Sequence, residues 1–436
     1  MPEISDHYKA RQPSGIRVAQ LEFEHRKDGV EAVNVAIGNV ILPMHPALKK
    51  RLDSIKDSPF KDGVVPYSSS IGLKETREAF LNVIASSGFK TEGLHVQITD
   101  GGSMAMEFII LGASGHFNGK ERPLLLIDAS YTNYGSLAER TRRKTVSITR
   151  HLHDHGKFSL PEISEIEQVI EKHRPAGMVV IPYDNPTGHF YDHKTMVKLA
   201  KVCVKFDMWM VSDEAYRELY YTDHDTSSIW GLTDKEVPGI EGRRISIETS
   251  SKVWNACGLR IGALVTDNKE FHDKAVAEST ANLCAPIIDQ WIFGALAHVS
   301  HDKLRAWYHK QRAYYKTMLH RFTDDLKKRL PGVIISSPDA SIYSVVDVRN
   351  LVDKGFNALD FVMWCTMESK VAIDGKDYTL LVAPMAGFYN VEKGEPNPGR
   401  TQMRIAYVEP PDRMELVSRL FSELFNEYVR HHEKNN

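Results

Sequence analysis

Residues 177–216 read GMVVIPYDNPTGHFYDHKTMVKLAKVCVKFDMWMVSDEAY, and this stretch decides the fold class. It opens with an unbroken apolar run, GMVVIP (177–182), and ends with a second run, MWMVSD (208–213). Between the two runs, HKTMVKLAKVCVKF (193–206) has apolar residues at helical spacing. Continuous apolar runs are typical of strands buried on both faces, so the stretch predicts a strand, a helix and a second, parallel strand.

The same alternation continues on both sides of this stretch. Three further apolar runs lie at 123–128, 244–249 and 261–267, and a second helix-like stretch spans 161–173. Alternating strands and helices predict an α/β protein with a mostly parallel sheet that is covered by helices on both faces.

A long helical pattern over 298–330 follows the last of these runs, and the chain beyond it mixes short strands with an amphipathic helix. We therefore expect a large domain over 61–300 and a smaller α+β domain over 301–436 that includes the linking helix. We expect residues 1–60 to form an N-terminal segment that joins the small domain.

Charge and composition exclude several classes of protein. The 436 residues include 57 acidic and 55 basic side chains, so the formal net charge of −2 gives no basic surface for nucleic acid. No apolar run reaches the roughly 20 residues of a membrane helix. The four cysteines lie far apart in the sequence, which favours reduced thiols and a cytoplasmic location.

Polar side chains follow the predicted strands, where α/β sheets bind their ligands. Asn185 lies in a turn, YDNPTG, after the first strand quoted above, and Asp213 and Tyr216 follow the second. Thr249, Ser251 and Lys252 follow the run at 244–249, and Arg260 lies eight residues beyond the lysine. Each motif alone is compatible with an ordinary turn or a solvated strand end, but their order and spacing make coincidence a poor explanation.

This ordered set of motifs resembles the class I/II aminotransferases, the fold type I enzymes that use pyridoxal 5′-phosphate (PLP). The resemblance runs from about Asn34 to Pro410 and includes aspartate aminotransferase-like features. It implies a large domain with a seven-stranded type of sheet, a smaller α+β domain, and a homodimer with shared active sites. It also implies amino acid and 2-oxo acid substrates.

The resemblance assigns a role to each group around the cofactor ring. Lys252 bonds covalently to the PLP aldehyde and later moves the substrate proton. Asp213 keeps the ring nitrogen protonated, so that the ring can take up electrons. Asn185 and Tyr216 donate to the phenolate oxygen of the ring, and Tyr131 stacks on its face.

The resemblance also implies how the phosphate is held. Backbone N–H groups at a helix start, hydroxyls and a guanidinium suit an anion, and the matching residues are Gly101, Gly102, Ser103, Thr249, Ser251 and Arg260. The family usually has serine where Thr249 stands. Tyr67 resembles the tyrosine that reaches the phosphate from the neighbouring subunit.

Substrate binding is implied for three residues. Arg404 matches the arginine that binds the α-carboxylate, Gly38 matches a glycine that lines the substrate, and Asn185 also faces it. The alternative for Arg404 is a surface arginine on an edge strand. The stretch 275–290 contains no arginine for an acidic side chain, which favours amino acid donors without one. The sequence APMAGF (383–388) departs from the family pattern.

The predicted function is therefore the transfer of an amino group from an α-amino acid to a 2-oxo acid, such as 2-oxoglutarate or pyruvate, by a ping-pong mechanism. A β-eliminating lyase or another PLP enzyme on the same fold is the alternative. A PLP-sensing regulator is disfavoured, because residues 1–33 are short for a DNA-binding domain. We expect no metal site, and we interpret the alternating histidines in RHLHDHGKF (150–158) as solvated.

Overall fold

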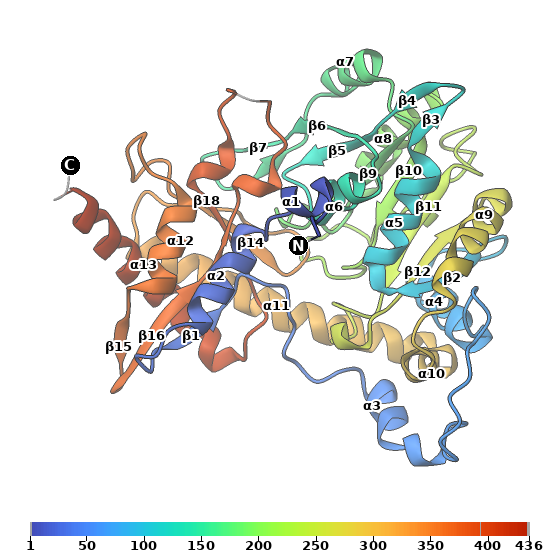
Figure 1. The fold of residues 1–436 in the computed structure, drawn as a ribbon, viewed down its shortest axis with the longest axis horizontal. Helices are drawn as coiled ribbons and strands as arrows, with labels where there is room; N and C mark the ends of the chain where they lie inside the picture. The colour runs from blue at the N-terminus through green and yellow to red at the C-terminus, as the bar shows by residue number, and fades with distance from the viewer. Residues whose placement is uncertain (1, 393, 434–436) are drawn as a thin grey trace. The chain divides into compact units, whose positions relative to one another are not determined.

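The computed structural model describes residues 2–392 and 394–433 (Figure 1). The chain divides into two compact units. The large unit comprises 39–317 and 336–343, and the small unit comprises 1–38, 318–335 and 344–436.

A seven-stranded sheet forms the centre of the large unit (Figure 1). Its strands, in spatial order, are β2 (His95–Asp100), β12 (Ile261–Thr266), β11 (Arg244–Thr249), β10 (Trp209–Asp213), β9 (Gly177–Val180), β5 (Leu124–Asp128) and β6 (Thr145–Thr149). β12 runs antiparallel to both of its neighbours, and the other six strands share one direction. The predicted α/β fold with a mostly parallel sheet is confirmed.

Each of the five apolar runs forms one strand of this sheet, whereas the two edge strands were not predicted. β2 and β6 have the sequences HVQITD and TVSIT, which mix polar and apolar residues. Every residue of β6 is only partly buried. An edge strand is not enclosed on all sides, so its sequence lacks the continuous apolar run that marks an inner strand.

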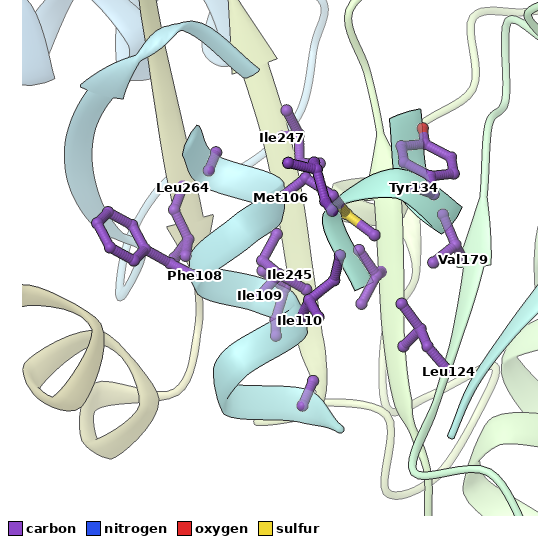
Figure 2. Packing of buried hydrophobic residues seen from close by; sticks show 14 of the residues in the cluster. Met106, Phe108, Ile109, Ile110, Leu124, Tyr134, Val179, Ile245, Ile247 and Leu264 are labelled. Atoms are coloured by element: carbon purple, nitrogen blue, oxygen red, sulfur yellow. The ribbon is translucent and has the colours of Figure 1, made fainter. Parts of the chain in front are cut away.

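Helix α5 (Gly101–Ala113) packs its apolar side chains onto one face of the sheet (Figure 2). Met106, Ile109 and Ile110 are buried in one cluster with Ile247 and Leu264 of the sheet. Burial of each such side chain stabilises the fold by about 1.5–3 kcal/mol. This packing holds the start of α5 at the sheet edge where β2 ends.

Other helices complete the large unit. α6 (Asn133–Arg140) and α9 (Lys269–Ser279) contribute to the same cluster as α5, and α7 (Ile163–His173) and α8 (His193–Lys205) contact β6 and β10. The remaining elements are α3 (Pro46–Asp53), η1 (Ile55–Asp57), α4 (Lys74–Ser86), β3 (Gly115–Phe117), β4 (Lys120–Arg122), β7 (His151–Leu152), β8 (Phe158–Ser159), η2 (Ile229–Gly231), η3 (Cys257–Leu259), η4 (Thr280–Asn282), α10 (Ile287–Gly294), η5 (Ala295–His298) and the first part of α11 (His301–Arg329).

The small unit contains two sheets with strand orders β1-β16-β15 and β13-β14-β18-β17. Their strands are β1 (Glu31–Asn34), β13 (Ile334–Ile335), β14 (Tyr343–Asp347), β15 (Val371–Ile373), β16 (Lys376–Leu381), β17 (Ala383–Pro384) and β18 (Gln402–Ala406). Its helices are α1 (Asp6–Ala10), α2 (Gly15–Glu24), α12 (Ala358–Met367), η6 (Ala386–Phe388), η7 (Pro398–Thr401) and α13 (Pro411–Glu433). Within the described residues of both units, no helix combines the length and apolarity needed to cross a membrane.

Candidate active site

The strand directions bring many of the predicted site residues to one edge of the large sheet. β2 ends at Asp100, β10 at Asp213 and β11 at Thr249, and these three strands point the same way. β12 runs in the opposite direction and begins directly after Arg260. Arg260 therefore lies at the edge where its neighbouring strands end, although it precedes its own strand.

The first residue of α5 lies against the guanidinium of Arg260. Gly101 has a φ of +70°, and a Cβ there would lie 2.5 Å from Nη2 of Arg260. Arg260 Nη1 also donates to the backbone oxygen of Cys257 at 3.2 Å, which holds the side chain in place. The first N–H groups of a helix have no partners within the helix, so a helix start beside a guanidinium is a site for an anion.

Two hydroxyls accompany this helix start. Thr249 Oγ1 and Ser251 Oγ lie 2.7 Å apart, and the backbone N–H of Ser251 donates to Thr249 Oγ1 at 3.0 Å. A Cβ on Gly102 would lie 3.0 Å from Ile247 and 4.0 Å from the Cβ of Thr249, so α5 begins beside the end of β11. Backbone donors, hydroxyls and a guanidinium in one place are the donor set that fits a phosphate group.

Asp213 is held by two hydrogen bonds. Its Oδ2 accepts from the hydroxyl of Tyr134 at 2.5 Å, and its Oδ1 accepts from the backbone N–H of Ala215 at 3.1 Å. Burial raises the pKa of Asp213 above its usual value, and the two hydrogen bonds act against that rise. Burial and the adjacent carboxylate raise the pKa of Tyr134 well above its usual value, so Tyr134 remains a donor. A carboxylate supported in this way fits the protonated nitrogen of a pyridine ring.

Sequence reasoning missed Tyr134. It lies near the start of α6, is 1% exposed and belongs to the apolar cluster under the sheet (Figure 2). Its ring meets that of Tyr131 edge to face, with centroids 5.5 Å apart, and Tyr131 is partly exposed. The only sequence signal was a second tyrosine three residues after Tyr131, which does not distinguish a core residue from a site residue.

A buried ion pair fixes the turn that carries Asn185. Asp184 is fully buried, and its carboxylate accepts from Arg150 Nη1 at 2.8 Å and from the backbone N–H of Thr187 at 3.1 Å. Burial raises the pKa of Asp184, and the charge of Arg150 opposes that rise. Asn185, the next residue, is buried. No motif marked Arg150, which lies one residue after β6.

Tyr216 has a partner that the sequence did not indicate. Its hydroxyl lies 2.8 Å from the hydroxyl of Tyr343, and the two rings meet edge to face with centroids 5.7 Å apart. Both side chains are buried. The hydroxyl of Tyr216 is therefore oriented by a residue 127 positions away in the chain.

Lys252 lies in a loop that is fixed on both sides. The backbone N–H of Ser250 donates to Ile261 at 2.9 Å, and the N–H of Asn255 donates to the backbone oxygen of Lys252 at 3.3 Å. The indole N–H of Trp307, on α11, donates to Val253 at 2.8 Å. The loop thus holds Lys252 just beyond the hydroxyls of Thr249 and Ser251.

The small unit carries Arg404 and Gly38. Arg404 is 4% exposed on an inner strand, which excludes a surface arginine on an edge strand. Its Nη2 donates to the backbone oxygen of Ala36, two residues before Gly38, at 2.7 Å. Its guanidinium also lies 5.1 Å from the ring centre of Phe388, so the unusual segment 383–388 packs on this arginine.

Tyr67 is on the surface, and the histidine segment makes local contacts. Tyr67 is 78% exposed. His153 lies 2.8 Å from Ser159 and stacks on His155. Across residues 2–392 and 394–433, no three His, Cys, Asp or Glu side chains are grouped so that they could bind a metal ion.

Comparison with known proteins identifies the family of this chain. The family model for aminotransferase class I and II matches residues 34–383. The Escherichia coli glutamate-pyruvate aminotransferase AlaA is 22% identical over 331 residues, which cover 72% of this chain and 75% of that protein.

Solved structures show the same fold. An aspartate aminotransferase mutant of Thermus thermophilus superposes with a TM-score of 0.78 at 18% identity, covering 97% of this chain and 100% of that chain. The kynurenine aminotransferase of Pyrococcus horikoshii gives a TM-score of 0.77 at 18% identity, covering 98% and 97%. With its fold type I architecture and a family match over most of its length, the chain belongs to the class I and II aminotransferases.

Proposed function

We propose that this aminotransferase binds PLP at the carboxyl edge of the large sheet and moves an amino group from an α-amino acid to a 2-oxo acid in a ping-pong cycle. The family depends on PLP. One observation carries the proposal for this chain: the Arg260 guanidinium lies against the first residue of α5, at the same sheet edge as the supported carboxylate of Asp213. This arrangement offers a phosphate site and a ring-nitrogen partner within one unit.

Bound PLP would supply an electron-withdrawing ring that stabilises negative charge on the substrate Cα. The N–H groups of Gly101, Gly102 and Ser103, with Arg260 and the hydroxyls of Thr249 and Ser251, would hold the phosphate. Asp213 would hold a proton on the ring nitrogen, because Tyr134 and the N–H of Ala215 favour its ionised form.

Four other side chains would act at the ring and the substrate. Lys252 Nζ would bond covalently to the cofactor; once the substrate amine has displaced it, the free Lys252 amine would accept the proton that leaves the substrate Cα. Asn185 and Tyr216 would donate to the ring oxygen, and the contact with Tyr343 orients the Tyr216 hydroxyl. Tyr131 would cover one face of the ring.

Arg404 would bind the substrate α-carboxylate through its planar guanidinium, and Gly38 would line the substrate. The contacts of Arg404 with Ala36 and Phe388 support this role, because they hold the buried guanidinium in one orientation. The missing arginine in 275–290 supports donors without an acidic side chain, and the similarity to a glutamate-pyruvate aminotransferase supports alanine as such a donor, with 2-oxoglutarate as acceptor.

We also propose a homodimer with shared active sites. Val64, Val65 and Tyr67 are 65%, 51% and 78% exposed and lie within four residues of each other. An exposed apolar segment of this kind is typical of a surface that a second subunit covers. In that dimer, Tyr67 would reach the phosphate of the neighbouring subunit.

A cytoplasmic location completes the proposal. All four cysteines are free thiols, and two of them, Cys203 and Cys365, are buried. Unpaired cysteines are typical of the reducing cytoplasm.

The activity is tested by incubating the PLP-loaded protein with single amino acids and either 2-oxoglutarate or pyruvate, and by measuring glutamate or alanine. We expect one small group of donors to give product at a rate that depends on both substrates. Pyruvate and ammonia released without an acceptor would contradict transamination and indicate a β-eliminating lyase.

A further inference from the structure

Two glutamates next to the proposed cofactor site share a single arginine. Glu214 follows Asp213, and Glu248 precedes Thr249. Arg217 Nη2 lies 2.7 Å from Glu214 Oε2 and 2.5 Å from Glu248 Oε1, so both carboxylates converge on one nitrogen. All three side chains are almost fully buried, with exposed fractions of 1–2%.

The surroundings supply hydrogen-bond donors, and the described ion pairs add no second cation. Glu214 Oε1 accepts from the hydroxyls of Ser212 and Ser228 and from the backbone N–H of Ile229. Glu248 accepts from Ser246 and from Arg217 Nε. Among the described ion pairs, Arg217 is the one cation that meets either carboxylate. Tyr183, Tyr308 and Asp213 also interact electrostatically with these three side chains, and none of them is a cation.

A small cavity adjoins the three side chains. Its volume is about 10 Å³, and its lining includes Glu214, Arg217, Glu248, Thr249 and Tyr308. The apolar part of the lining comes from Phe80, Val83, Val253 and Trp254. This space is about the size of one water molecule, so it has no room for a cation together with water ligands of its own.

Two ionised carboxylates against one guanidinium would leave a negative charge buried without a partner. Such a charge is costly, and closely spaced like charges favour the neutral form of one group. Burial and the charge of Glu248 raise the pKa of Glu214 to about 7, although Arg217 opposes the rise. A proton on one carboxylate balances this charge without needing any further space.

We propose that Glu214 carries a proton below neutral pH, and that the proton-dependent contact of Glu214 and Glu248 with Arg217 clamps the ends of β10 and β11. Asp213 is the neighbour of Glu214 in the sequence, and Thr249 is the neighbour of Glu248, so the clamp holds both in register. The backbone N–H of Glu214 also donates to the backbone oxygen of Ile247 at 3.0 Å. Glu214, Arg217 and Glu248 are positioning residues, and their role at the cofactor rests on the proposed function.

The clamp predicts a definite dependence of stability on pH. Glu214 titrates near pH 4.5 when unfolded and near pH 7 when folded, so the folded chain binds more protons between these values. The free energy of unfolding therefore falls as the pH rises through this window, and this contribution is lost above about pH 7.

The test follows the unfolding temperature of the full-length protein from pH 5 to pH 9, with and without PLP. We expect the wild type to lose about 2 °C or more relative to Glu214→Gln between pH 5 and pH 8. Glu218→Gln is the matched control, because Glu218 is a buried carboxylate in the same segment that pairs with Arg312. Glu218→Gln should follow the wild type. Parallel curves for the wild type and Glu214→Gln would overturn the proposal.

If a variant fails to fold, infrared spectroscopy of the wild type still measures the protonation of the buried carboxyl group. A protonated carboxyl band should disappear on alkaline titration with a midpoint near pH 7, and Glu214→Gln should lack it. Absence of the band in the wild type, or a midpoint that moves with K⁺ at constant ionic strength, would overturn the proposal. The cofactor-free measurements do not depend on PLP, so failure to bind PLP would count against the proposed function and not against the proton on Glu214.

Discussion

In its proposed role, Asp213 keeps a negative charge at a position where burial favours its neutral form. Two donors, the hydroxyl of Tyr134 and the N–H of Ala215, offset this effect. Hydrogen bonds to a charged group contribute about 1.5–3 kcal/mol each. The ionised form of Asp213 therefore depends on Tyr134, a residue of α6.

The variant Tyr134→Phe removes one of these donors and leaves the ring in the core. Because that hydrogen bond lowers the pKa of Asp213, the acidic limb of the kcat/KM profile should move to higher pH in this variant. Tyr315→Phe is the control, since Tyr315 is a buried tyrosine whose hydroxyl has no hydrogen-bond partner among the described residues. An unchanged acidic limb in Tyr134→Phe would show that Tyr134 does not support the charge.

Arg404→Ala should lower kcat/KM through loss of the carboxylate contact, which typically contributes about 2–5 kcal/mol. The matched control is Arg400→Ala, because Arg400 is an exposed arginine in the same segment. Steady-state kinetics with the best donor measures the effect, and the unfolding temperature shows whether the variant is folded. A folded Arg404→Ala protein with near-wild-type kcat/KM would rule out this role.

The candidate site residues that the sequence indicates lie in motifs next to strands, whereas the partners that it does not indicate are core aromatic residues. Asp213, Asn185 and Lys252 follow apolar strands within recognisable motifs, so the sequence offers them as candidates for the site. Tyr134 and Tyr343 contact these motifs only through the fold, and each looks like an ordinary core aromatic in the sequence. Long-range partners of this kind carry no local signal.

At the scale of elements, strand direction and one helix start account for the site. Inner strands could be predicted because burial on both faces demands continuous apolar runs, whereas the mixed sequences of β2 and β6 concealed the sheet edges. The antiparallel direction of β12 was not predicted either, and it is this direction that brings Arg260 to the start of α5.

Gly101→Ala tests the helix start directly. The added Cβ would lie 2.5 Å from the Arg260 guanidinium, so we expect weaker PLP binding by at least about tenfold. Gly88→Ala is the control, because Gly88 also has a positive φ but a Cβ there would meet no atom within 4 Å. Equal PLP dissociation constants for the two variants, measured by fluorescence titration, would contradict a phosphate site at this position.

At the scale of the whole molecule, the exposed segment that contains Val64, Val65 and Tyr67 needs an explanation, since a single chain leaves it uncovered. Val65→Glu places a charge on this segment and should shift the protein from dimer to monomer in sedimentation experiments, with weaker PLP binding. Met367→Glu, at an exposed methionine on α12, is the control and should remain dimeric. A wild-type protein that sediments as a monomer would refute the shared active site.

Amino-group transfer to the cofactor tests the central claim most directly. The PLP-loaded protein is mixed with stoichiometric amino acid donor and no 2-oxo acid, and the extracted cofactor is identified by its mass. We predict conversion to pyridoxamine phosphate with release of one 2-oxo acid per site, and no conversion by Lys252→Ala. Unchanged PLP with every common amino acid, or conversion by Lys252→Ala at the wild-type rate, would contradict the account.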